Sequence, residues 1–150
     1  MQYIRSRTKH PLGPPDGDEP VDLVQGFAQH YTAAWCSQDA ASVAAFFMPN
    51  GSLSINGGAP SVGRSEITKA AQEFMSAFPD MVLTMDDIFP VGDQFIYKWT
   101  LTGTNTGPGG TGNKVNISGY EEWLFGVEGL VAKSMGHFDN ADYQRQLAKG

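Results

Sequence analysis

A carboxylate and an imidazole stand at the end of the last strand-like stretch of the sequence. His137 and Asp139 are two residues apart and follow an apolar run that begins at Leu130. Because strand side chains alternate between the two faces, both groups are expected to project from the same face. An acid beside a potential base predicts proton-transfer chemistry in a small enclosed pocket.

The same residues also fit a structural interpretation. A helical pattern follows directly, with Tyr143 and Leu147 four residues apart, and Asp or Asn is favoured at a helix N-cap. Asp139 is therefore either an acid/base or a cap, and His137 is either its neighbour in a site or an imidazole bonded to a backbone carbonyl. The pattern leaves both alternatives open.

The amino-acid composition indicates which classes of protein the chain can belong to. The chain has 150 residues, 41% hydrophobic and 17% charged, which favours one globular domain. Its net charge is −6 with scattered basic residues, which argues against a nucleic-acid or anionic-membrane partner. The sequence shows no apolar run of about 18 to 20 residues, as a membrane span needs, and no apolar signal core at its start.

The cysteine and histidine content indicates which disulfides and metal sites the chain can form. A lone Cys36 excludes an internal disulfide and favours a cytoplasmic protein. The three histidines are scattered and lack the spacing of a metal site. We therefore expect no metal.

The spacing of apolar residues, together with the prolines and glycines, predicts the secondary-structure elements of the chain. Prolines and glycines predict a flexible tail over residues 1–19, with one domain over 20–150. Helical spacing predicts helices near 20–37, 40–47 and 64–78, separated by a turn at Asn50-Gly51, a strand at 52–55 and a loop at 57–63.

After Asp80 the apolar period changes from about 3.6 to 2. Strands are expected at 81–89, 95–102, 114–125 and 130–138, with a glycine-rich loop at 103–113. Helices followed by adjacent strands are typical of an α+β fold, with the helices on one face of a strongly bent antiparallel sheet. Alternation leaves open whether Tyr120 or Glu121 faces the interior.

Four stretches of the sequence stand out by their order and spacing: Val62-Gly63-Arg64-Ser65-Glu66-Ile67, Phe78-Pro79-Asp80-Met81, Gly103-Thr104-Asn105-Thr106-Gly107, and Asp139 followed by Gln146-Leu147. Together they resemble, along residues 20–148, the motifs of the SnoaL-like polyketide cyclases, in the nuclear-transport-factor-2-like superfamily. Asn105 replaces the usual His of one motif, and Met135 stands where an aromatic residue is usual.

The resemblance implies a cone-shaped sheet around an apolar pocket, and general acid/base chemistry without a cofactor. It places the acid/base on Asp139. His137, on the same strand face, could tune this carboxylate, donate a hydrogen bond to the oxyanion or shuttle the proton. The residues expected to bind a small apolar, polyketide-like or cyclic substrate are Tyr31, Trp35, Trp99, Asn105, Tyr120 and Met135.

The superfamily leaves the reaction open among aldol-type cyclisation, isomerisation, dehydration (a lyase reaction) and hydrolysis. It also leaves open a non-catalytic ligand-binding or dimerisation module. A homodimer packed through the sheet is common in the family. Four large aromatics on the expected strands, more than one cone interior holds, also predict a homodimer: Tyr97, Trp99, Trp123 and Phe125.

Overall fold

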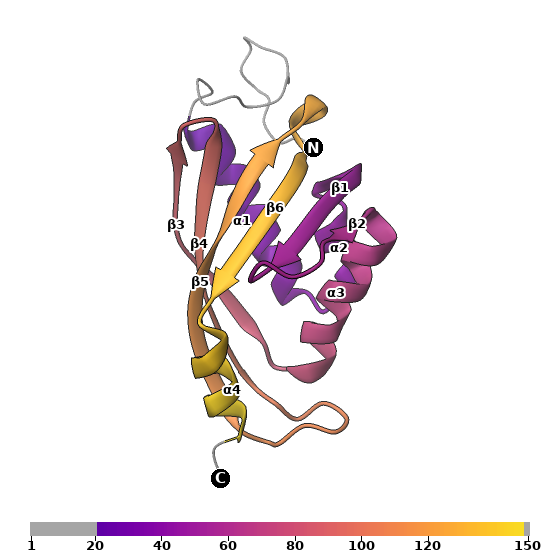
Figure 1. The fold of residues 1–150 in the computed structure, drawn as a ribbon, viewed down its shortest axis with the longest axis vertical. Helices are drawn as coiled ribbons and strands as arrows, with labels where there is room; N and C mark the ends of the chain where they lie inside the picture. Colours follow the sequence, from indigo (N-terminus) through magenta and orange to yellow (C-terminus); the bar gives the residue numbers. More distant parts are fainter. Residues whose placement is uncertain (1–20, 149–150) are drawn as a thin grey trace.

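The computed structural model describes residues 21–148, so the tail expected at 1–19 lies outside the described residues. Three helices precede most of the strands, and a fourth ends the domain (Figure 1). The helices are α1 (Val21–Cys36), α2 (Ala40–Ala44), α3 (Arg64–Ala77) and α4 (Asn140–Ala148). The strands are β1 (Phe47–Ile55), β2 (Ser61–Val62), β3 (Val82–Val91), β4 (Gln94–Thr104), β5 (Lys114–Phe125) and β6 (Val131–Phe138), with a 3-10 turn, η1, at Val127–Gly129.

The strands form one curled sheet in the order β2-β1-β6-β5-β4-β3. Neighbours pair antiparallel except β1 and β6, which run parallel. A parallel pair needs a long crossover, and here the connection includes α3 and the three strands β3 to β5. The α+β class is confirmed, and this one pair departs from the expected antiparallel pattern.

In Figure 1, α1 runs behind the strands and α3 lies beside β1 and β2, whereas α4 lies at the lower end of β5. In α1 the buried residues Val24, Phe27, Ala28 and Tyr31 recur at three- and four-residue spacing, which gives the helix one apolar face. No helix within residues 21–148 is both long and apolar enough to cross a membrane.

Two local expectations differ from the structure. The helix expected at 40–47 ends at Ala44, because Phe47 already enters β1. Asn50-Gly51, expected as a turn, lies inside β1, where the register with β6 shifts between Phe47 and Ser52. The loop expected at 57–63 also contains the short strand β2, which pairs with β1.

The four aromatics taken as a sign of a dimer all belong to the interior. Tyr97, Trp99 and Trp123 are buried in the core, and Phe125 packs against it. The interior accommodates them because they meet at angles, as in the edge-on pair Trp123 and Phe125, or stack, as Tyr97 does on Trp123. That argument for a dimer is therefore wrong, and the homodimer itself stays a prediction.

Candidate active site

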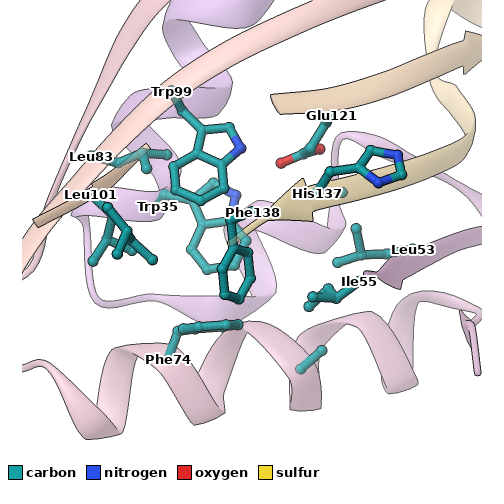
Figure 2. Close-up of a pocket in the computed structure, with 13 residues that line it drawn as sticks. Trp35, Leu53, Ile55, Phe74, Leu83, Trp99, Leu101, Glu121, His137 and Phe138 are labelled. Atoms are coloured by element: carbon teal, nitrogen blue, oxygen red, sulfur yellow. The ribbon is translucent and has the colours of Figure 1, made fainter. Parts of the chain in front are cut away.

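An apolar cavity of about 60 Å³ lies between the sheet and the helices α1 and α3 (Figure 2). Its volume exceeds the roughly 10–15 Å³ that one water molecule requires. Aromatic and aliphatic side chains make most of the wall. The lining residues are Trp35, Leu53, Ile55, Ala70, Phe74, Leu83, Trp99, Leu101, Ile117, Glu121, Gly136, His137 and Phe138.

Glu121 is the carboxylate of this cavity, and only 7% of its surface is exposed. It lies on the inward face of β5, in register with the buried residues Ile117 and Trp123. The residue paired with it on β6 is Gly136, which has no side chain to cover the carboxylate. Figure 2 shows the carboxylate directed toward the indole rings of Trp99 and Trp35.

Three buried groups donate hydrogen bonds to one oxygen of this carboxylate. Tyr31 Oη, Trp123 Nε1 and Ser134 Oγ lie 3.0, 2.8 and 2.8 Å from Glu121 Oε1. Glu121 Oε2 accepts only the longer contact from Tyr31, at 3.2 Å. Because Oε1 already has its partners, Oε2 is the oxygen left to exchange a proton with a ligand.

Burial raises the pKa of the Glu121 carboxyl, and hydrogen bonds from Trp123, Ser134 and Tyr31 offset only part of that rise. An apolar surrounding disfavours the charged carboxylate, so its proton is held to higher pH than in water. Burial also raises the pKa of the Tyr31 phenol, with the Glu121 charge as the next contribution. The phenol therefore stays a donor to Glu121.

The position of Trp99 depends on a glycine in the neighbouring strand. Gly119 pairs with Trp99 across β4 and β5, and a Cβ added to it would lie 2.6 Å from the Trp99 ring and 2.3 Å from the His137 carbonyl oxygen. No side chain fits at that separation, so glycine is needed there for the indole to cross β5 and reach the cavity.

Asp139, expected to reach the internal pocket, instead caps α4. It is exposed, and its Oδ1 accepts a hydrogen bond from the backbone N–H of Asp142 at 3.0 Å. Asp139 therefore acts as a helix cap, which is the structural alternative that the sequence left open. The expected internal position is wrong, because helical backbone directly after the strand presents unpaired N–H groups to this carboxylate.

His137 contributes to the cavity wall, but its imidazole points away from the indoles (Figure 2). Its Nε2 lies 2.6 Å from Glu122 Oε2, and the ring stacks on Tyr120 with centroids 4.7 Å apart. His137 and Asp139 do share a shallow surface depression with Tyr120, but not an enclosed site. The expectation that both side chains reach an internal pocket is therefore wrong, and their part in catalysis stays a prediction.

The six residues expected to bind substrate are divided by the fold. Trp35 and Trp99 line the cavity, and Tyr31 lies behind it with its hydroxyl on Glu121. Asn105 instead ties the β4–β5 loop, donating to the Ala77 carbonyl and accepting from the Thr111 N–H. Tyr120 and Met135 pair with His137 and Glu122, on the sheet face opposite to Glu121, because alternation turns them outward.

Sequence reasoning did not choose Glu121, although a signal was present. Val115, Ile117 and Trp123 alternate along β5 at the same parity, and Glu121 interrupts that apolar row. A carboxylate in register with buried residues costs free energy unless it is hydrogen-bonded. Within residues 21–148, no three His, Cys, Asp or Glu side chains gather as a metal would need.

Solved structures with the same fold share little sequence identity with this chain. A protein with a ketosteroid isomerase-like fold from Catenulispora acidiphila is 14% identical, with 81% of this chain and 91% of that chain covered and a TM-score of 0.70. A protein with a nuclear-transport-factor-2-like fold from Burkholderia pseudomallei is 18% identical, over 83% and 96% of the two chains, also at 0.70. At such identities the likeness shows the fold alone.

A third structure is the epoxide hydrolase/cyclase-like enzyme SalBIII, which takes part in pyran ring formation in salinomycin. It is 13% identical, with 81% of this chain and 95% of that chain covered and a TM-score of 0.70. No curated protein matches the sequence. The SnoaL-like polyketide cyclase profile matches residues 25–147, which confirms the family predicted from the motifs. The chain therefore belongs to the SnoaL-like polyketide cyclase family.

Proposed function

We propose that this protein is a cofactor-independent enzyme that moves a proton on a small apolar, cyclic or polyketide-like substrate. Glu121, rather than Asp139, is the acid/base of this proposal. The observation that carries it is a buried carboxylate on the wall of an apolar cavity, with its pKa raised by burial. A base whose pKa lies nearer the working pH transfers protons more effectively.

The geometry supports a simple chemical step. Glu121 Oε2 would accept a proton from a carbon next to a carbonyl group. The electron pair of the broken C–H bond would form a C=C bond, and the carbonyl π pair would move to oxygen as an enolate. In a β,γ-unsaturated ketone the enolate is conjugated with the second C=C bond, and returning the proton to its far (γ) carbon gives an isomerisation. Attack of the enolate carbon on a second carbonyl re-forms the first C=O bond and leaves an alkoxide, which takes the proton back from Glu121 to complete an aldol-type ring closure.

A second candidate function is a ligand-binding module of the same fold without chemistry. The capping position of Asp139 favours it, because the acid/base implied by the family then serves the helix. The two functions differ in whether the protein exchanges carbon-bound hydrogen.

Hydrogen exchange on a model ketone tests the proposal without knowledge of the natural substrate. 2-Indanone is a flat ketone whose acidic C–H bonds flank its carbonyl, and their replacement by deuterium in D₂O is followed by proton NMR. The wild-type protein should accelerate exchange above the buffer rate. Glu121→Gln should lower the protein-catalysed rate by about 10²- to 10⁴-fold. Its amide oxygen can replace Oε1 as acceptor for Tyr31, Trp123 and Ser134, so the fold is kept.

A wild-type rate equal to that of the buffer, with 2-indanone bound, would favour the binding module. A catalysed rate that survives in Glu121→Gln would remove Glu121 from the mechanism.

A further inference from the structure

One polar group of the cavity has no hydrogen-bond partner among the described residues. Trp35 Nε1 is buried and makes no hydrogen bond within residues 21–148, and Trp35, only 9% exposed, lines the cavity. Burial raises the pKa of the nearby Tyr31 phenol and the Trp35 N–H opposes that rise, yet no oxygen of these residues meets the geometry of a hydrogen bond to this indole. Buried donors are normally paired, so an unpaired one indicates a missing acceptor.

The surroundings of this N–H suit an oxygen atom of a ligand. The rest of the wall is almost wholly apolar, and Glu121 is the only carboxylate among the lining residues. Figure 2 shows the nitrogen of Trp99 on the ring edge nearer Glu121, so a second indole N–H also lies on this side of the cavity. The cavity thus combines a carboxylate with indole donors, and indole nitrogen is a donor only.

We propose that Trp35 Nε1–H is the specificity-determining donor of the cavity and that its ligands are flat carbonyl compounds, whose oxygen accepts this hydrogen bond. The inference rests on the proposed function and names its substrate class. A carbonyl oxygen on Trp35 leaves the neighbouring C–H bonds toward Glu121. Negative charge that develops on this oxygen strengthens the hydrogen bond, which is the condition for stabilising an enolate. A hydrocarbon of the same shape leaves the donor unpaired.

A matched pair of probes separates these cases. 2-Indanone and indane share a ring system and differ by the carbonyl oxygen. The chain has three tryptophans, so an amide–indole NMR spectrum resolves three Nε1–H signals, which single Trp→Phe variants assign. Titration with 2-indanone should shift the Trp35 signal downfield, and titration with indane should leave it nearly in place.

Trp35→Phe keeps an aromatic ring and removes the donor. It should weaken 2-indanone binding about five- to tenfold, the value of one neutral hydrogen bond, and change indane binding less than twofold. If this variant does not fold, Trp35 is replaced by 3-benzothienylalanine, which retains the shape of tryptophan with sulfur in place of N–H. The same affinities are then measured.

An unmoved Trp35 signal on 2-indanone binding, equal losses for both probes, or no binding of either probe would overturn the inference, as expected if water alone occupies the cavity. The two proposals fail separately. Absence of hydrogen exchange with the Trp35 preference intact removes only the enzyme, whereas exchange that persists without that preference removes only the role of Trp35. Glu121→Gln should keep the shift of the Trp35 signal.

Discussion

Glu121 and Asp139 are both carboxylates on or just after neighbouring strands, yet their surroundings are opposite. Glu121 is buried, faces the cavity and accepts hydrogen bonds from three side chains. Asp139 is exposed and accepts one from a backbone N–H at the start of α4. Burial raises the pKa of Glu121, whereas Asp139 keeps contact with water.

This difference shows that the face of the sheet on which a carboxylate lies indicates its suitability as an acid/base better than its position along the strand does. A carboxylate needs removal from water to become a base near neutral pH, and only the inward face of β5 supplies that. The carboxylate at the strand end instead accepts a hydrogen bond from a backbone N–H at the start of α4, which keeps it on the outside of the domain.

Removing the Glu121 carboxyl altogether should produce the largest change in stability. Glu121→Ala leaves Tyr31, Trp123 and Ser134 without their acceptor inside the protein. Unpaired buried donors are costly, so the free energy of unfolding should fall by about 2 to 4 kcal/mol. Urea denaturation measures it, with Glu121→Gln as control, which should lose less because its amide oxygen still accepts. A loss no greater than that of the control would mean that the donors find water instead.

The stability of the wild type should depend on pH through Glu121. Its pKa is raised in the folded protein above the ordinary value of 4.5, so the folded state binds the proton more tightly than the unfolded state. The contribution is fully present below the unfolded pKa and is lost as pH rises through the folded pKa.

The check subtracts the pH profile of Glu121→Gln from that of the wild type, both by urea denaturation. The difference should fall as pH rises above about 4.5 and level off beyond the folded pKa. A flat difference would show that Glu121 titrates as an ordinary exposed carboxyl.

The strand-end carboxylate should matter for stability alone. Asp139→Ala removes the cap of α4 and should lower the free energy of unfolding by about 0.5 to 2 kcal/mol. 2-Indanone exchange should stay within twofold of the wild-type rate. Asp139→Asn is the control, because Asn also caps helices and should retain most of the stability. An exchange rate lost in both variants would restore Asp139 as the acid/base.

The outward pair beside Asp139 should contribute least. His137 Nε2 and Glu122 Oε2 are 2.6 Å apart, with side chains 35% and 27% exposed. Partly exposed pairs of this kind are worth about 0 to 1 kcal/mol. Glu122→Gln should therefore change the free energy of unfolding by less than about 1 kcal/mol and leave exchange unchanged. A large loss of exchange would indicate that His137 acts on the substrate.

Much of the fold followed from periodicity, and the site followed only in part. The apolar spacing of Val24, Phe27 and Tyr31 predicts α1 and its buried face, and the motifs predict the family. Alternation in β5 places Glu121 on the same face as Trp123. Which face of β5 is turned to the interior, however, depends on how β4 and β6 pack beside this strand. Such long-range pairing is absent from any local pattern.

The orientations of single side chains were the least predictable. His137 and Asp139 share a strand parity, as expected, but parity does not say which face the helices cover. Asn105 illustrates the same limit, since its ties to Ala77 and Thr111 exist only after the β4–β5 loop folds back. The parallel pairing of β1 with β6 likewise depends on a crossover that spans most of the domain.

The claim that Glu121 rather than Asp139 is the acid/base is tested most directly by two isosteric variants side by side. Glu121→Gln and Asp139→Asn each replace one carboxylate oxygen by an NH₂ group, so the carboxylate becomes an amide and the side chain keeps its shape. Hydrogen exchange on 2-indanone is measured for both, with thermal unfolding confirming that each is folded. We expect a loss of about 10²- to 10⁴-fold for Glu121→Gln and a rate within twofold of the wild type for Asp139→Asn. A folded Glu121→Gln that keeps its rate while Asp139→Asn loses it would contradict the account.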